Sequence, residues 1–370
     1  MTEPLRVLQV FTILNRGGAE TMVMNYYRHI DRSRVQFDFL VCRPEKGAYE
    51  DEIEAMGGRI YRIPPLLHVR SHRSAVRRFF AEHPEYQIIH GHVGELGYFI
   101  YKKARHAGVR CIIAHAHSSY CDRDWKLPLR YILKFLIRKQ VTHTMACGVE
   151  AARWYFGSSQ AKRCLIVRNA VDAKCYRYSQ EKRAQVREHF GWDSHLIIGN
   201  VARFSKVKNH LFLLEIIEEL RKQRPDVLLV LVGDTKGDIY ESIKSQVEKL
   251  GLTQHVQFLG SRKDVPDLLQ GMDVYCAPSL YEGLSVSMVE AQAAGLHVIT
   301  STGVPEEVRL MPDSVSFLSL DGSVEHWVDR LLAPYERKDT YAELCQAGYD
   351  IVENARRLQQ FYLDQVKTKN

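Results

Sequence analysis

The sequence has 370 residues, is 45% hydrophobic and 26% charged, and carries a formal net charge of +7, which is the composition of an ordinary globular protein with two or three domains. Its eight scattered cysteines include no C-x-x-C pair, which argues against a disulfide framework and for a reducing cytosol. The N-terminus lacks the pattern of a signal peptide and no apolar run approaches a bilayer-spanning length, so we expect a cytoplasmic protein.

The positive charge is concentrated in the first half of the chain. Residues 1–180 hold 29 Lys and Arg against 16 Asp and Glu, a difference of +13, whereas the remainder holds 22 against 28, a difference of −6. This asymmetry suggests an anionic partner for the first half, either nucleic acid or a membrane surface.

Short Val/Ile/Leu-rich runs alternate with longer helix-like stretches along the whole chain. The first run of each half is almost unbroken apolar sequence, as expected for a strand that is covered on both faces. Strand–helix alternation predicts parallel sheets built from right-handed crossovers. The expected strands, seven in the first half and six in the second, are Leu5–Thr12, Val35–Cys42, Arg59–Ile63, Gln87–His92, Val109–Ala114, Val141–Cys147 and Cys164–Val167, then Leu196–Val201, Val227–Val232, Val256–Leu259, Asp273–Pro278, His297–Thr300 and Val315–Leu318.

These two sets predict an α/β protein with two facing Rossmann-like domains, residues 1–168 and 173–339, and a boundary near 168–172. A last helical segment, about Thr340–Lys367, has no strand after it. Ligands of open parallel sheets bind beyond the carboxyl ends of the strands, so two facing domains would hold a ligand in the cleft between them.

The loop after the first strand contains the glycine pair Gly17 and Gly18. Adjacent glycines between a strand and a helix let a phosphate approach the helix N-terminus closely. The spacing is not G-x-G-x-x-G, so the dinucleotide fingerprint is absent and a simple tight turn is the alternative.

Two histidines follow the fifth strand in Ala114-His-Ala-His-Ser-Ser119, and strand alternation places His115 and His117 on the same side. They are either ligand-binding residues or polar residues at the end of a strand. A metal site with the neighbouring Asp122-Arg-Asp124 is the less favoured alternative, because the spacings match no structural zinc pattern.

Residues 125–139 read as a mostly apolar helix with one basic stripe. This pattern suits an anionic membrane surface, and the alternative is a core helix whose cations face solvent. Nucleic acid is disfavoured because no matching motif is present. The residues of this expected membrane or acceptor surface are Trp125, Lys126, Arg130, Lys134 and Arg138.

The second half opens with a strand followed by Arg203 and Lys208. Two cations at the turn after a strand are suited to a diphosphate, with arginine as a planar fork and lysine as a point charge. The alternative is that both are ordinary surface cations.

The segment from Ser279 to Ser301 places two carboxylates, Glu282 and Glu290, around the start of a helix. We expect Ser285 to be the N-cap of a helix that begins near Val286, with the turn at Gly283 open for a phosphate. Glu282 would then face a sugar and Glu290 the hydroxyls of a ribose. Helix capping alone would explain Glu282 but not Glu290.

The E-x7-E spacing of Glu282 and Glu290 resembles the signature of family 4 glycosyltransferases, which are retaining enzymes with the GT-B fold. Gly17–Glu20 is similar to the family's N-terminal glycine loop. Asn169–Asp172 resembles its N-G-V-D hinge with Ala170 in place of glycine, and Val201–Lys208 resembles its G-R-x4-K segment with Ala202 where glycine is common. The A-H-A-H sequence followed by a basic helix resembles the branch that builds bacterial exopolysaccharide and capsule.

The resemblance implies a role for each matching residue. Arg203 and Lys208 would neutralise the donor diphosphate, so neither a metal nor another cofactor is expected. His117, or less favourably His115, would meet the sugar at the reacting centre, where Glu282 would also act. The expected donor-binding residues are Gly17, Gly18, Arg203, Lys208, Glu282, Gly283, Leu284, Ser285 and Glu290.

The function implied by the resemblance is transfer of a hexosyl or N-acetylhexosaminyl group, with retention, from a nucleotide diphosphate sugar to a saccharide acceptor. UDP is the expected nucleotide, and the acceptor is expected to be polyprenyl-diphosphate-linked and presented at the inner face of the cell membrane. Domain 1–168 would bind the acceptor, domain 173–339 the donor, and residues 340–370 would return to the first domain. The alternatives are a sugar-nucleotide 2-epimerase of the same fold and a non-catalytic membrane-surface interaction protein.

Overall fold

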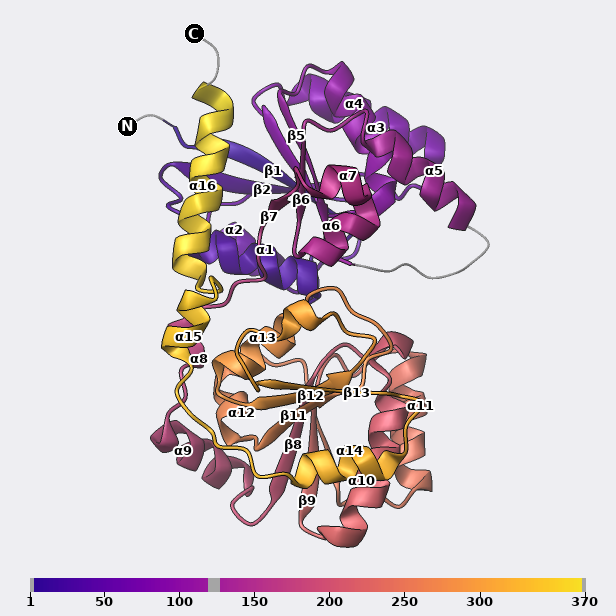
Figure 1. Ribbon diagram of the computed structural model, residues 1–370. Coiled ribbons are helices and arrows are strands. Elements are labelled where there is room, and N and C mark those ends of the chain that lie inside the picture. The colour runs from indigo at the N-terminus through magenta and orange to yellow at the C-terminus, as the bar shows by residue number, and fades with distance from the viewer. Residues whose placement is uncertain (1–2, 119–126, 368–370) are drawn as a thin grey trace. The chain divides into compact units, whose positions relative to one another are not determined.

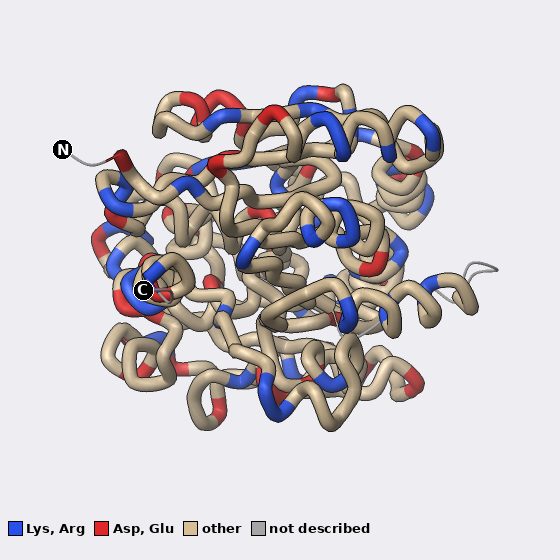
Figure 2. Tube along the Cα trace, turned by 90° about the horizontal axis from the view of Figure 1, so that it is seen from above, with Lys and Arg blue, Asp and Glu red and all other residues tan. Residues whose placement is uncertain are grey.

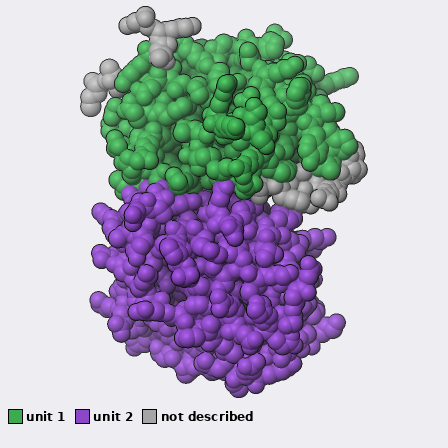
Figure 3. Space-filling view, in the orientation of Figure 1, with its two compact units in different colours: residues 1–170, 351–370 green, residues 171–350 purple. Residues whose placement is uncertain are grey.

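The computed structural model describes residues 3–118 and 127–367. The chain forms two compact units, which are distinguished by colour in Figure 3. Unit 1 comprises residues 1–170 and 351–370, and unit 2 comprises residues 171–350. Lys and Arg occur along the trace with Asp and Glu among them (Figure 2).

Unit 1 contains a seven-stranded parallel sheet with the order β3-β2-β1-β4-β5-β6-β7. β2 and β5 are buried along their whole length, because helices cover both faces of the sheet (Figure 1). The strands are β1 (Leu5–Phe11), β2 (Val35–Val41), β3 (Ile60–Arg62), β4 (Ile88–Gly91), β5 (Cys111–Ala116), β6 (His143–Ala146) and β7 (Leu165–Ile166).

The helices of unit 1 pack in two groups. α16 contacts α1 and β2, whereas α4 contacts α3, α5 and β5. The bounds are α1 (Gly18–His29), α2 (Glu50–Ala55), α3 (Val69–Glu82), the 3-10 turn η1 (Gly94–Gly97), α4 (Tyr98–His106), α5 (Leu127–Ile137), α6 (Val149–Phe156), α7 (Ser158–Ala161) and α16 (Ile351–Lys367).

Unit 2 contains a six-stranded parallel sheet with the order β10-β9-β8-β11-β12-β13. Its core joins strand residues such as Ile198 and Leu229 to the buried Trp327 of a covering helix. The strands are β8 (Leu196–Val201), β9 (Val227–Val232), β10 (Val256–Gly260), β11 (Val274–Ala277), β12 (His297–Ser301) and β13 (Val315–Leu318). The helices and turns are α8 (Ala173–Tyr176), α9 (Gln180–Phe190), η2 (Lys206–Lys208), α10 (His210–Gln223), α11 (Asp238–Lys249), α12 (Val265–Gly271), α13 (Val286–Ala293), η3 (Glu306–Val308), α14 (Val324–Leu332) and α15 (Tyr341–Gln346).

The expected α/β architecture with one seven-stranded and one six-stranded parallel sheet is confirmed. The return of the last helix to the first sheet is also confirmed, since Gln359 Oε1 accepts a hydrogen bond of 2.6 Å from the amide of Asp31. The return begins at Ile351 rather than near Thr340, because α15 packs on α8 within unit 2.

Over the residues that the structure describes, no helix is both long and apolar enough to cross a bilayer.

Candidate functional site

The loops that follow β8 and β11 bring two of the predicted residues of unit 2 into direct contact. The ammonium of Lys208, at the end of η2, forms an ion pair with the carboxylate of Glu282, and the Ser279 hydroxyl donates a 3.0 Å hydrogen bond to the same carboxylate. The two loops are also joined through the backbone, because the amide of Leu280 donates to the carbonyl of Val207 at 2.8 Å. The side chains of Lys208 and Glu282 are only 18% and 14% exposed, so a ligand charge beside them would be weakly screened.

Arg203 lies just after β8, and its side chain is exposed. Within residues 3–118 and 127–367, no carboxylate forms an ion pair with it. It is therefore a cation at the carboxyl edge of the unit 2 sheet whose guanidinium is available to an anionic ligand.

α13 begins at Val286 with Ser285 as its N-cap residue, as the sequence predicts. The Ser285 hydroxyl makes no capping hydrogen bond to the helix and instead lies 3.2 Å from the hydroxyl of Ser287. Since Ser285 does not cap the first turn, its hydroxyl does not compete with an anion for the first amides of the helix. Gly283 and Leu284 form the bend that leads into it.

Glu290 lies within α13 and is buried, with 7% of its surface exposed. The Tyr176 hydroxyl donates a 2.7 Å hydrogen bond to its Oε1 atom. Tyr176 ends α8, a one-turn helix that Asp172 caps by accepting hydrogen bonds from the amides of Lys174 and Cys175. The polar Asn169–Asp172 segment thus leads directly to the residue that orients Glu290.

In unit 1, Gly17 is the N-cap residue of α1 and Gly18 is its first residue. A Cβ atom at Gly17 would lie 2.3 Å from Oε2 of Glu20, whereas a Cβ atom at Gly18 would meet no atom within 4 Å. The N-cap residue of α1 is a glycine and so supplies no side-chain cap of its own. Open space beside the first backbone atoms of the helix is what close approach of a phosphate requires.

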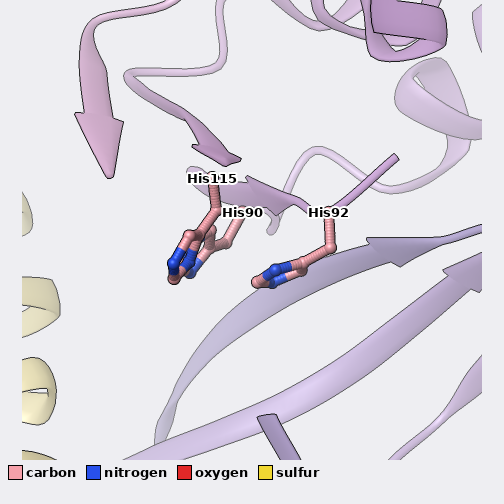
Figure 4. A group of neighbouring side chains, drawn as sticks. All are labelled: His90, His92 and His115. Atoms are coloured by element: carbon pink, nitrogen blue, oxygen red, sulfur yellow. The ribbon is translucent and has the colours of Figure 1, made fainter. Parts of the chain in front are cut away.

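Four histidines gather at the carboxyl ends of β4 and β5, and Figure 4 shows three of them pointing in the same direction. The rings of His115 and His117 stack with centroids 4.2 Å apart, which confirms that they lie on the same side. His90 Nε2 lies 3.0 Å from His115 Nδ1, and His92 Nδ1 lies 2.7 Å from His117 Nε2. The residue between His90 and His92 must be glycine, because a Cβ atom at Gly91 would lie 1.9 Å from the Tyr101 hydroxyl.

These histidines are neutral at physiological pH. Burial lowers the pKa of His90 to about 3 and that of His117 to about 4, and burial also lowers the pKa values of His92 and His115 well below 6.5. His117 is half-buried whereas His115 is only 3% exposed, so His117 is the better placed of the two to meet a ligand.

One ring nitrogen from each of His90, His92 and His115 lies within 4.8 Å of the other two, so these residues could in principle hold a metal ion. A tetrahedral zinc ion at about 2.0–2.1 Å would hold its nitrogens roughly 3.3 Å apart. Hydrogen bonds between the rings already occupy these nitrogens, at distances that neutral imidazoles adopt without an ion.

The predicted basic stripe of residues 125–139 is wrong in its orientation. Lys134 is buried, donates a 2.8 Å hydrogen bond to the Trp154 carbonyl and lies 3.3 Å from the centroid of the Trp154 ring. Arg130 forms an ion pair with Glu95 at 3.3 Å, while Arg138 is exposed. Trp125 and Lys126 lie outside the described residues.

The face of α5 that points outward is apolar instead. Its buried positions, Leu133, Lys134 and Ile137, recur with the spacing of one helix face, and the half-buried Arg130 lies on the same face. Both cations have partners within unit 1, Glu95 for Arg130 and Trp154 for Lys134. The opposite face exposes between 54% and 57% of four large side chains, Leu129, Tyr131, Ile132 and Phe135.

Comparison with known proteins decides the family. Residues 16–174 match the model for "Glycosyltransferase Family 4" and residues 182–350 match that for "Glycosyl transferases group 1". The chain is 36% identical to the putative glycosyltransferase EpsF of Bacillus subtilis over 96% of both proteins. The chain is a family 4 glycosyltransferase.

Two further relatives extend this relationship. The chain is 24% identical to the capsular polysaccharide biosynthesis glycosyltransferase CapH of Staphylococcus aureus, over 80% of this chain and 81% of that protein. It is 23% identical to the UDP-Gal:alpha-D-GlcNAc-diphosphoundecaprenol alpha-1,3-galactosyltransferase of Escherichia coli, over 90% of this chain and 91% of that protein. The family 4 enzyme is thus related to enzymes of exopolysaccharide and capsule synthesis.

The two-sheet architecture is also that of Anabaena HepE, solved in complex with UDP-glucose. That structure superimposes with a TM-score of 0.74 at 21% sequence identity and covers 98% of this chain and 96% of HepE. The likeness shows the GT-B fold expected from the sequence resemblance.

Several residues that line these two sites in this family 4 glycosyltransferase were not predicted. Tyr176 contacts Glu290, and Gln9, His90, His92 and Tyr362 contact the predicted histidines or their neighbours. His92 could have been predicted, since it ends the expected strand Gln87–His92 at the sheet edge where His115 and His117 were expected. Gln9 lies inside an apolar run and Tyr362 in a mixed polar and apolar helix, and neither position indicated a contact with these histidines.

Proposed function

We propose that this glycosyltransferase moves a sugar, with retention, from a UDP-sugar to a polyprenyl-diphosphate-linked saccharide in exopolysaccharide or capsule synthesis. The observation that carries the proposal is the set of Lys208, Glu282 and Glu290 near the start of α13, where the Ser285 hydroxyl does not cap the helix. EpsF and CapH support the pathway class, HepE with UDP-glucose supports the donor, and the E. coli relative supports a lipid-diphosphate acceptor.

The donor diphosphate is assigned to Arg203, Lys208 and the first amides of α13. Arginine and lysine there would neutralise the negative charge that builds on the leaving diphosphate as the glycosidic bond breaks, so the reaction requires no metal in this proposal. Gly18 would add backbone contacts to the same group.

The two glutamates are assigned different parts of the donor. Glu290, held by Tyr176, would accept hydrogen bonds from the ribose hydroxyls, and Glu282, held by Lys208 and Ser279, would accept hydrogen bonds from hydroxyls of the transferred sugar. His117 would contact that sugar at the reacting centre. Since Glu282 is paired with a lysine, we assign it to binding and propose a front-face displacement rather than a covalent intermediate.

The exposed apolar face of α5 replaces the basic stripe as the proposed membrane contact. Side chains such as Ile132 and Phe135 would enter the headgroup region, while the exposed Arg138 and Lys139 at the end of the helix would meet anionic lipid. Such a contact would bring unit 1 to an acceptor that is itself anchored in the bilayer.

Incubation with donor alone and with donor plus bacterial lipid extract tests the proposal. Transfer of labelled sugar to lipid, and no change in the donor without lipid, is the expected result. Conversion of the donor to its 2-epimer without acceptor would instead support the epimerase alternative. Intact donor under both conditions, with any of several UDP-sugars, would favour a non-catalytic membrane-surface protein.

A further inference from the structure

The four histidines of unit 1 belong to a larger buried network of side-chain hydrogen bonds. Gln9 of β1 and Tyr362 of α16 complete it, and both are buried, with 1% and 0% of their surfaces exposed. Gln9 lies at the junction, because its amide oxygen faces His92 and its amide nitrogen faces Tyr362. The network therefore has two arms that start from one amide group.

The first arm runs from Gln9 through His92 to His117. Gln9 Oε1 carries no hydrogen, so the 3.0 Å contact requires the proton of the neutral His92 ring to sit on Nε2. Nδ1 of His92 is then an acceptor. The 2.7 Å contact to His117 in turn requires a proton on Nε2 of His117, which leaves Nδ1 of His117 with a lone pair.

The second arm runs from Gln9 through Tyr362 and His90 to His115. Gln9 Nε2 donates to the Tyr362 hydroxyl at 3.5 Å, and that hydroxyl donates to Nδ1 of His90 at 2.6 Å. His90 then donates from Nε2 to Nδ1 of His115 at 3.0 Å. The arm ends on Nε2 of His115, which is buried and has no hydrogen-bond partner in the described part of the chain.

We propose that Gln9 is a positioning residue that fixes the ring tautomers of both arms, so that His117 presents an unprotonated Nδ1 as a hydrogen-bond acceptor for a hydroxyl of the transferred sugar. The identity of the ligand rests on the proposed function, whereas the tautomers do not. The low pKa values of the four rings support this arrangement, since each ring then holds a single proton.

The consequence is a defined polarity at the sugar. An isolated neutral imidazole can donate from either nitrogen, and a ring that exchanges tautomers would both donate to and accept from the ligand. A ring held as an acceptor favours a substrate that offers a hydroxyl there and disfavours one that lacks it, because Nδ1 would lose its partner. Since Tyr362 belongs to α16, the last helix contributes to the network as well as to the fold.

Proton-detected nitrogen NMR of the deuterated full chain, with 15N-labelled histidine, measures the tautomers directly. The expected result in the ligand-free wild type is a proton on Nε2 of all four rings, assigned with the single variants His92→Gln and His117→Gln. A proton on Nδ1 of His117 would overturn the proposal, and it is what the opposite orientation of the Gln9 amide would produce.

Two variants separate the arms. Gln9→Leu should turn the His117 signal into that of a tautomer mixture and should lower kcat/KM roughly 2- to 12-fold, the range for loss of one hydrogen bond. Tyr362→Phe removes a single oxygen and should alter only the His90 and His115 signals. If Gln9→Leu lowers stability but leaves the His117 tautomer unchanged, Gln9 has a purely structural role and the proposal is wrong.

A zinc site is the competing explanation for the close approach of the His90, His92 and His115 ring nitrogens. We expect the Tm of the wild type to be the same with Zn²⁺ as with EDTA. A rise in Tm with Zn²⁺ that His92→Gln abolishes would show that the nitrogens bind a metal rather than each other.

The sugar contact is tested separately from the tautomers. If the tautomers are as proposed but the His117 Nδ1 resonance does not shift on addition of any UDP-sugar, the sugar contact alone is refuted. Failure of sugar transfer, in contrast, would refute the proposed function and leave the tautomers intact.

Discussion

Lys208 and Glu282 lie 74 positions apart in the sequence and form an ion pair at the carboxyl edge of the unit 2 sheet. In the proposed function this pair would place a positive and a negative group within reach of the same donor, the lysine beside its diphosphate and the glutamate beside its sugar hydroxyls. Each group also holds the other in place before a ligand arrives, which is the kind of pre-organisation that transition-state stabilisation requires.

We predict that Lys208→Met lowers kcat/KM for glycosyl transfer by about 100-fold or more, because a cation facing the leaving diphosphate is lost and Glu282 is left without its partner. Lys206→Met is the matched control, since Lys206 lies in the same turn with an exposed side chain. Steady-state kinetics of both variants provide the measurement. Equal activity of the two would show that Lys208 has no special role.

Substitution on the outer face of α5 should weaken membrane association. Burying one such side chain contributes about 1.5–3 kcal/mol, so Ile132→Asp or Phe135→Asp should reduce partitioning to anionic vesicles roughly 10- to 150-fold. Leu211→Asp, at a position that is 47% exposed in unit 2, should have no effect. Sedimentation with vesicles measures this, and unchanged partitioning of both α5 variants would exclude this face as the contact.

Lys134 should behave as a core residue although it is a lysine. Lys134→Met leaves the Trp154 carbonyl without its donor and removes the contact with the Trp154 ring, so we expect the free energy of unfolding to fall by about 1–3 kcal/mol. Arg138→Met, at the exposed end of the same helix, should change it by less than about 0.5 kcal/mol. Urea unfolding distinguishes the two, and the reverse order would restore the outward basic stripe.

Stability should decrease in mild acid because of the buried histidines. The unfolded chain binds a proton near pH 6.5 at each histidine, whereas burial lowers the folded-state pKa of His90 to about 3 and that of His117 to about 4. The contribution to stability is therefore complete above pH 6.5 and is lost as the pH falls toward 4, by about 1.4 kcal/mol per pH unit for each ring that stays neutral.

Urea midpoints measured at pH 7.5, 6 and 5 test this dependence. We expect a steady decrease, and a shallower one in His117→Gln. A midpoint that does not change between pH 7.5 and 5 would mean that these rings are protonated in the folded protein.

The sheets could be predicted because strands buried on both faces are written as continuous apolar runs. Leu196–Val201 and Val227–Val232 were predicted with the bounds that β8 and β9 have. The predicted end of β5 was two residues early, because the polar His115 interrupts the apolar run although the strand continues to Ala116. A run of hydrophobic residues cannot reveal a strand whose last side chains are polar and satisfied by distant partners.

The orientation of α5 could not be predicted for a related reason. The spacing of Arg130 and Lys134 correctly placed both on one face, but periodicity does not show which face is buried. Burial of Lys134 depends on Trp154, which lies on α6 and meets it only in the folded unit.

The candidate site shows the same limit. The sequence identified Glu282 and Glu290 by their positions around a helix start and Lys208 by its place after a strand. The pairing of Lys208 with Glu282 and the contact of Tyr176 with Glu290, however, join distant segments. Gln9 and Tyr362 are 353 positions apart, and their hydrogen bond joins the first strand to the last helix. Partners of this kind become visible only when side chains are placed in space.

The most direct test of the account is calorimetric binding of UDP, GDP and ADP to the wild type and to Glu290→Ala, with Glu325→Ala as an exposed control in unit 2. A hydrogen bond to a charged group contributes about 1.5–3 kcal/mol, so we predict that UDP binds the wild type and the control alike and binds Glu290→Ala roughly 10- to 150-fold more weakly. Binding of UDP that Glu290→Ala leaves unchanged, or no binding of any of the three nucleotides to the wild type, would contradict the assignment of α13 to the donor.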